Sequence, residues 1–191
     1  MSQLIFEAKQ RIQRVRMKDV EVVVTHHGKP VPNAAVSLRM KNHQFLFGAV
    51  CYAHGKFGHP GKEARFTELF TKLFNYTMVP YHWSWYEPRR GEYNEPYTGD
   101  LVRWLNAPAG VVDDDLNPKP VYATLYDLIH RQWHTDADLT ASSEGRCGTK
   151  VFCGTYEITA WSGGMKKTVT RDIHRESFYE GGGKQLICVD L

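Results

Sequence analysis

The stretch Asp19 to Thr25, DVEVVVT, is rich in β-branched residues, and it decides how the rest of the chain is interpreted. Such side chains favour extended backbone, so this stretch predicts a strand. Gly28-Lys29-Pro30 supplies a turn, and Ala35 to Met40, AVSLRM, alternates apolar and polar residues as a second strand. Gln44 to Val50, QFLFGAV, is predicted to be a more fully buried strand.

The carboxyl-terminal part carries a second group of predicted strands. They cover Thr149 to Trp161, Met165 to Ile173 and Lys184 to Asp190, with turns at Ser162-Gly163-Gly164 and Gly181-Gly182-Gly183. Neither end has enough strands to be stable alone, because a lone hairpin is marginal in water. We therefore expect a mainly β fold, with one β-sandwich built from the N- and C-terminal strands.

The residues between these groups read as helix, strand and helix. Apolar residues recur at helical spacing over Glu63 to Phe74 and after Pro120, which suits a first helical turn. The same spacing over 4–16 predicts a further helix before the first strand. Asn75 to Trp83 has strand character, Leu101 to Leu105 reads as a short helix, and 106–120 reads as a connector. The predicted division is 1–50 and 135–191 for the two halves of the sandwich, and 51–134 for the central segment.

Composition and charge exclude several classes of protein. The chain has 191 residues, 42% of them apolar, with 24 Lys and Arg against 21 Asp and Glu. This balance argues against a nucleic-acid partner, and no apolar run approaches the roughly 18 residues that span a bilayer. The start, Met1-Ser2-Gln3-Leu4, lacks the apolar core of a secretory signal. Aromatic residues reach 13%, which suits either a core or a stacking surface for sugars or bases.

The four cysteines are Cys51, Cys147, Cys153 and Cys188. Cys147 and Cys153 lie too far apart in sequence for the close pairs of common zinc sites. A disulfide across one hairpin and four reduced thiols are equal alternatives, so the cysteines leave the compartment open.

Two separate stretches resemble glycoside hydrolase family 10, the endo-1,4-β-xylanases. The first matches the family's opening barrel strand, its second strand and a preceding β extension: Gly28 to Val36, Phe45-Leu46-Phe47-Gly48, Phe74-Asn75, His82-Trp83, Glu87-Pro88, Gly91 and Tyr93. The second matches its last barrel loop, final helix and C-terminal β extension: Ala107 to Gly110, Pro118 to Pro120, Tyr122, Leu125, Leu128-Ile129, Trp133, Thr135, Gly145, Phe152, Gly154 and Tyr156. The resemblance implies a remnant of a β/α barrel in the central segment, and secretion.

The barrel strands that carry the family's two catalytic glutamates are missing. The chain passes from Trp104-Leu105 almost directly to Ala107-Pro108. A retaining glycosidase needs two carboxyl groups about 5 to 5.5 Å apart, and Asn94-Glu95 lacks the apolar strand that precedes the family's acid. The second strand also departs from the family, because Tyr76-Thr77 and His82 replace its sugar-binding Glu-Asn pair and Lys. A full eight-stranded barrel also takes about 200 to 250 residues, more than the 191 of this chain. Because the strands with the catalytic glutamates are missing, no catalytic residue is assigned.

The candidate substrate-binding residues form the densest aromatic cluster of the chain: Tyr81, His82, Trp83, Trp85, Tyr86 and Glu87. In an alternating strand Tyr81, Trp83 and Trp85 share one face, which could stack pyranose rings while Glu87 accepts sugar hydroxyls. The alternative is that these rings form part of a core.

No cofactor or metal is expected. His130 and His134 have the spacing of two metal ligands on one helix, but no further ligand follows at a recognised spacing. Asp113-Asp114-Asp115 reads as a charged connector rather than a calcium site.

The sequence therefore favours non-catalytic binding of a xylan-like polysaccharide or oligosaccharide, with no nucleic-acid or membrane partner. Two alternatives stay open. One is a glycoside hydrolase completed in a homo-oligomer through exposed strand edges, which tend to pair. The other is a structural fragment without a ligand.

Overall fold

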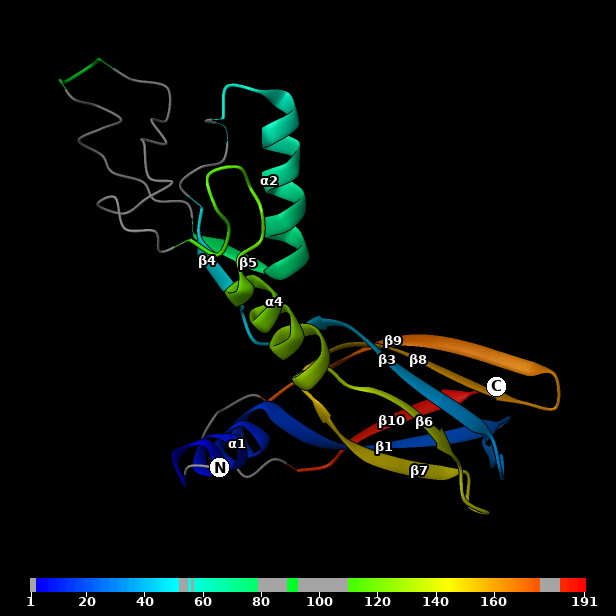
Figure 1. The fold of residues 1–191 in the computed structure, drawn as a ribbon. Coiled ribbons are helices and arrows are strands. Elements are labelled where there is room, and N and C mark those ends of the chain that lie inside the picture. Colours follow the sequence, from blue (N-terminus) through cyan, green and yellow to red (C-terminus); the bar gives the residue numbers. More distant parts are fainter. Residues whose placement is uncertain (1–2, 52–54, 56, 79–88, 93–109, 176–182) are drawn as a thin grey trace. The chain divides into compact units, whose positions relative to one another are not determined.

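The computed structural model describes residues 3–51, 55, 57–78, 89–92, 110–175 and 183–191 (Figure 1). The chain is mainly β, which confirms the fold class predicted from its strand pattern. It divides into two compact units. Unit 1 comprises Met1–Phe45 and Trp133–Leu191, and unit 2 comprises Leu46–Gln132.

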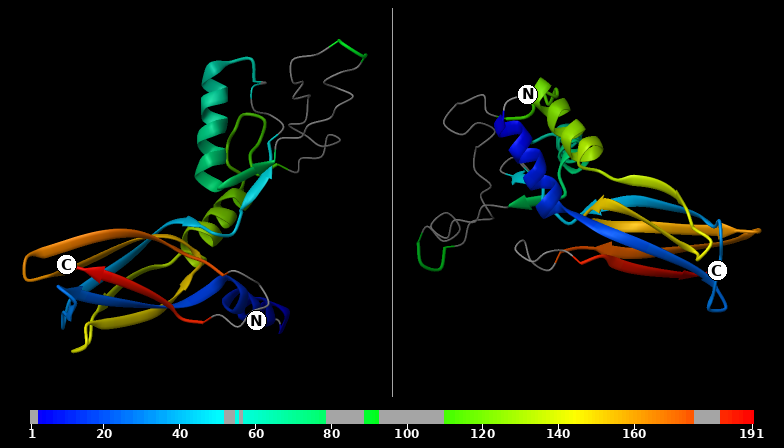
Figure 2. Two further views of the ribbon diagram at one scale, coloured as in Figure 1. Left: turned by 180° about the vertical axis from the view of Figure 1, so that it is seen from behind. Right: turned by 90° about the horizontal axis from the view of Figure 1, so that it is seen from below.

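Unit 1 contains one described helix and two sheets. Its elements are α1 (Gln3–Arg16), β1 (Met17–His26), β2 (Lys29–Pro30), β3 (Ala35–His43), β6 (Asp136–Thr140), β7 (Arg146–Phe152), β8 (Gly154–Ser162), β9 (Met165–Ile173) and β10 (Gln185–Asp190). The first sheet has the order β10-β1-β2, with β7 also paired to β1. The second has the order β6-β3-β8-β9, and the sheets form two layers (Figures 1 and 2).

Strands from the two ends of the chain pair directly. β1 and β10 are parallel, in a register that runs from Val20 opposite Gln185 to Thr25 opposite Asp190. β1 also pairs antiparallel with β7, so it lies between two strands from the carboxyl-terminal part. The N- and C-terminal strands therefore build one sandwich, because each supplies pairing partners that the other lacks.

The core of unit 1 lies between the sheets. Strand alternation sends every second side chain inward, so the pattern VEVVV in β1 buries Val20, Val22 and Val24. Both sheets contribute to one cluster, which includes Val36, Leu38, Val151, Tyr156, Ile158, Ala160, Ile173, Ile187 and Val189. The helix α1 has no buried residue, and only Ile12 of its apolar residues packs against this cluster.

The strand predicted over Thr149 to Trp161 is two strands in the structure. The chain leaves β7 in one sheet and enters β8 in the other, with Cys153 between them. The backbone passes so close to β3 that a Cβ at Gly154 would lie 2.1 Å from the carbonyl oxygen of Asn42. Glycine at this position therefore permits the change of sheet.

The prediction of one buried strand over Gln44 to Val50 is wrong. Only Gly48–Val50 (β4) is a strand, and its residues are exposed. Phe45 ends the first segment of unit 1 and Leu46 begins unit 2, so the apolar run crosses the boundary between two units instead of lying inside one sheet.

Unit 2 is built from short strands and helices. Its described elements are β4, α2 (Pro60–Leu73), β5 (Tyr76–Met78), α4 (Pro120–Asp127) and the π-helical η2 (Leu128–Gln132). β4 and β5 pair in parallel, and α2 lies between them in sequence. The Tyr122 hydroxyl of α4 donates to the carbonyl of Leu69 in α2 at 2.8 Å. None of the helices in the described ranges is long and apolar enough to cross a membrane.

Candidate functional site

The outer face of the β6-β3-β8-β9 sheet carries polar side chains around one tryptophan. Alternation along β8 buries Ile158 and Ala160 and turns Thr159 and Trp161 to the opposite side. Antiparallel pairing then places Ser37 of β3 opposite Thr159. The same face therefore carries an exposed indole ring, the half-buried Ser37 and Thr159, which is only 9% exposed.

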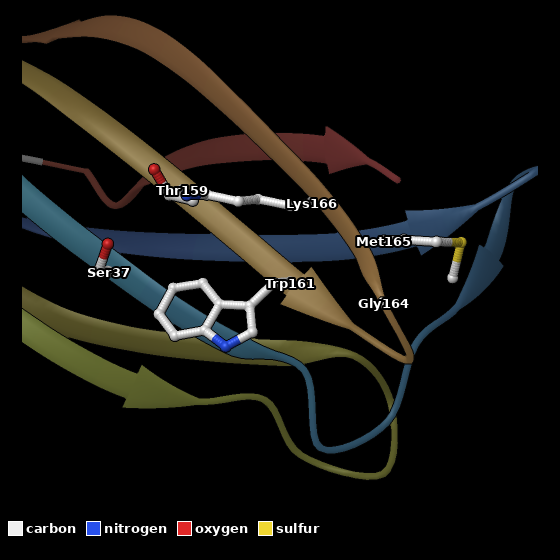
Figure 3. A pocket seen from close by; sticks show the side chains of 6 residues that line it. All are labelled: Ser37, Thr159, Trp161, Gly164, Met165 and Lys166. Carbon is white, nitrogen blue, oxygen red and sulfur yellow. The ribbon is translucent and has the colours of Figure 1, made fainter.

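A shallow hollow of about 440 Å³ lies on this face. Its described lining is Ser37, Thr159, Trp161, Gly164, Met165 and Lys166. Figure 3 shows the indole of Trp161 extending from β8 toward β3, on the side where Ser37 lies, whereas Met165 points away from the ring. The hollow is an open surface depression rather than an enclosed cavity, which suits a flat or extended ligand.

The indole is available to a ligand because its neighbours are small or flexible. The Trp161 residue is 42% exposed. Its register partners are Ala35 on β3 and Lys166 on β9. An alanine side chain does not rise high enough to cover the ring, and a lysine can move aside. Tryptophan combines a large apolar face with a polar N–H group, the chemistry that stacks on rings.

The polar groups around the indole are held in place. The hydroxyls of Thr159 and Thr168 lie 2.9 Å apart across β8 and β9 and share a hydrogen bond. Farther along the face, Arg39 pairs with Asp138 at 2.5 Å and Lys41 with Glu157 at 3.1 Å. Within each pair the positive and negative charges cancel, so these four residues add no net charge to the surface beyond the hollow.

The described lining contains one ionisable side chain, Lys166, and no carboxylate. Glycoside hydrolysis needs a pair of carboxyl groups flanking the scissile bond. The hollow can therefore stack a ring and exchange hydrogen bonds with hydroxyls, but its described residues supply no general acid and no nucleophile. Its chemistry is that of a binding surface.

The six residues predicted as the substrate-binding cluster lie outside the described residues, and so does Asn94-Glu95. These assignments stay predictions. The nearest described part of that loop is a turn at Gly91, where Arg89 and Glu92 form an ion pair at 3.3 Å. The strand pattern alone places Trp161 only at the end of a predicted strand. The alternation of Glu157, Thr159 and Trp161 could have identified it, because a tryptophan on the polar side of a strand is exposed.

The two histidines considered as metal ligands have separate partners. Nε2 of His130 lies 3.3 Å from the carbonyl oxygen of Leu73, and Nε2 of His134 lies 3.1 Å from a carboxylate oxygen of Asp136. The carboxylate of Asp113 accepts hydrogen bonds from the backbone and side chain of Asn117, which lower the pKa of Asp113. Within the described ranges, no three His, Cys, Asp or Glu residues gather as a metal site would require.

All four cysteines are free thiols in the structure. Cys147 packs against the core, whereas Cys188 is exposed on β10. Burial raises the pKa of both Cys147 and Cys153, so these thiols stay protonated at neutral pH. The structure contains no disulfide among these four cysteines, and the choice between the two alternatives stays a prediction.

The chain was also compared with known proteins, by family and individually. No protein-family model matches it, and no curated protein matches it either.

Proposed function

We propose that this chain is a non-catalytic carbohydrate-binding protein, with a xylan-like polysaccharide or oligosaccharide as its ligand. The observation that carries the proposal is the exposed indole of Trp161 in a shallow hollow beside the hydroxyls of Ser37 and Thr159. A pyranose ring has an apolar face that stacks on an indole and a rim of hydroxyls that exchange hydrogen bonds. The sequence resemblance to the family 10 xylanases supports the choice of a β-1,4-linked sugar.

The test is binding of xylohexaose and soluble xylan by calorimetry and affinity electrophoresis. Trp161→Ala removes the stacking surface and should weaken binding by at least about tenfold, about 1.4 kcal/mol. Leu186→Ala is the matched control, because Leu186 is also a large exposed apolar side chain and lies on a strand of the other sheet. It should leave the affinity within about twofold. Unchanged affinity in a folded Trp161→Ala protein would contradict the proposed site.

A third variant, Trp85→Ala, separates the hollow from the aromatic cluster predicted by sequence. If that variant alone loses binding, the cluster is the sugar platform and the hollow is not. Measurement of reducing-sugar release in the same samples tests the hydrolase alternative. Light scattering on the purified protein tests oligomerisation through strand edges. If an oligomer completes a hydrolase site, the hydrolysis rate should rise with the oligomeric fraction.

A further inference from the structure

A second hollow, of about 370 Å³, lies where α1 meets β1 and β7 in unit 1. Four basic side chains line it: Arg14 from α1, Lys18 from β1, Lys150 from β7 and Arg175 after β9. Asp19 is the one acidic residue in its described lining. Two adjacent elements, α1 and β1, and two parts of the chain far from them in sequence, β7 and the residues after β9, thus contribute one concentrated positive charge.

Among the described residues, the four cations have no anionic partners. In the described part of the chain, none of them forms an ion pair, although Lys150 lies opposite Asp19 in the β1–β7 register. The formal charge of the described lining is therefore +3, four cations less one carboxylate. Like charges in one hollow repel each other, and salt weakens this repulsion over a Debye length of about 10 Å at 0.1 M.

Backbone carbonyls and a side-chain amide hold two of the cations without neutralising them. Nζ of Lys18 donates to the carbonyl of His174 at 3.1 Å, and the guanidinium of Arg175 donates to the carbonyl of Arg14. The backbone N–H of Arg175 donates to the side-chain oxygen of Gln44 at 3.3 Å. These hydrogen bonds hold the charged groups in position although the groups repel each other. Nε of Arg175 is buried with no hydrogen-bond partner in the described structure.

We propose that this basic hollow binds an oxyanion ligand that carries at least two negative charges, in the form of phosphate or sulfate groups. Arg presents a planar fork of donors that matches such groups, and Lys adds mobile point charges. The amide side chains of Gln10 and Gln13 line the same hollow and supply uncharged donors. A single carboxylate would leave most of the positive charge uncompensated, so the hollow selects for multiple charge. This site shares no described lining residue with the Trp161 hollow and does not depend on the function proposed for it.

The experiment is calorimetry on the full chain with three probes: inorganic pyrophosphate, a disulfated disaccharide and glucuronate. We expect one site for a multiply charged probe and at least about tenfold weaker binding of glucuronate, and a fall in affinity as salt rises. The preferred probe shows whether phosphate or sulfate is the natural group. If neither multiply charged probe binds at 50 mM salt, or if glucuronate binds equally well, the proposal is overturned.

The variants Arg14→Gln and Lys150→Gln, combined, remove two charges from the hollow and should weaken binding by at least about tenfold. The matched control combines Lys29→Gln and Lys167→Gln, which removes the same charge from two exposed positions outside the described lining. It should leave the affinity within about threefold. Equal losses in both proteins would show general electrostatic attraction and would overturn the site. If the first variant does not fold, Lys150→Gln alone, at an exposed position of β7, takes its place with an expected loss of about threefold.

Discussion

The guanidinium carbon of Arg16 lies 4.9 Å from the centroid of the Trp133 ring. It also lies 4.3 Å from the centroid of Phe45 and 5.8 Å from that of Phe152. Phe45 is the last residue of unit 1 before unit 2, and Trp133 is the first one after it. One cation at the junction of α1 and β1 therefore contacts both points at which unit 1 is interrupted in sequence.

Arg16→Ala is expected to lower the free energy of unfolding of unit 1 by about 2 kcal/mol. Arg16 is half-buried and this burial lowers its pKa. Attraction between a cation and aromatic rings, worth about 2 kcal/mol or more, is strongest when the cation is partly removed from water. Arg16→Lys keeps the charge but loses the planar stacking, so it should cost less than alanine does. Urea unfolding, followed by Trp fluorescence and circular dichroism, measures both.

Arg11→Ala provides the control for this prediction. Arg11 lies on the same helix and is exposed, so its loss should change stability by no more than about 0.5 kcal/mol. Equal effects of the two alanine variants would mean that the rings around Arg16 contribute nothing beyond the helix itself.

Local pattern predicted the strands whose own residues alternate strictly between core and surface. The alternating valines of β1 and the alternation of β3 follow from residues within each strand. The change of sheet at Cys153 and the exit at Phe45 depend on which distant strands pair, which no local window contains. The sequence does not predict β6, DADLT, because it is a short polar edge strand whose one partner among the described strands is β3. The Trp161 hollow has a similar origin, since its lining comes from three strands.

Tyr156→Phe is expected to destabilise unit 1 by about 1 kcal/mol at pH 8. The buried Tyr156 hydroxyl donates to the carbonyl of Phe152 at 2.7 Å, and phenylalanine leaves that carbonyl without this donor. Burial raises the pKa of Tyr156, so the folded state keeps a proton that the unfolded chain loses above about pH 10.

The stabilisation that comes from Tyr156 is thus fully present below about pH 10 and decreases as pH rises beyond it, by up to about 1.4 kcal/mol per pH unit. The difference in stability between wild type and Tyr156→Phe should therefore shrink toward zero near pH 11. Urea unfolding at both pH values measures it. A difference that is constant with pH would show that the hydroxyl titrates alike in both states.

Cys188 is expected to react with a thiol reagent far faster than Cys153 in the folded protein, by about a hundredfold or more. Cys188 is exposed, whereas Cys153 is buried and burial raises its pKa, so both restricted access and a smaller thiolate fraction slow the reaction of Cys153. Labelling at pH 8 with peptide mass spectrometry gives the order. Cys188→Ser should remove the fast phase, and persistence of that phase would assign it to another thiol.

Replacing residues 46–132 with a flexible linker of about six residues should give a folded unit 1. Every residue of the sandwich core belongs to unit 1, and the two ends to be joined both contact Arg16. A short glycine-serine linker has the reach and adds little closure entropy. Circular dichroism and cooperative urea unfolding would establish the fold, and the same deletion with Arg16→Ala should unfold at lower urea.

The shortened chain also separates the two candidate sugar surfaces. It lacks the cluster Tyr81, His82, Trp83, Trp85, Tyr86 and Glu87 but keeps Trp161, Ser37 and Thr159. Because the hollow is built from β3, β8 and β9 within unit 1, the shortened chain should bind xylohexaose within about threefold of the full chain. A folded shortened chain that no longer binds would move the sugar site to unit 2, because the hollow would be intact and unoccupied.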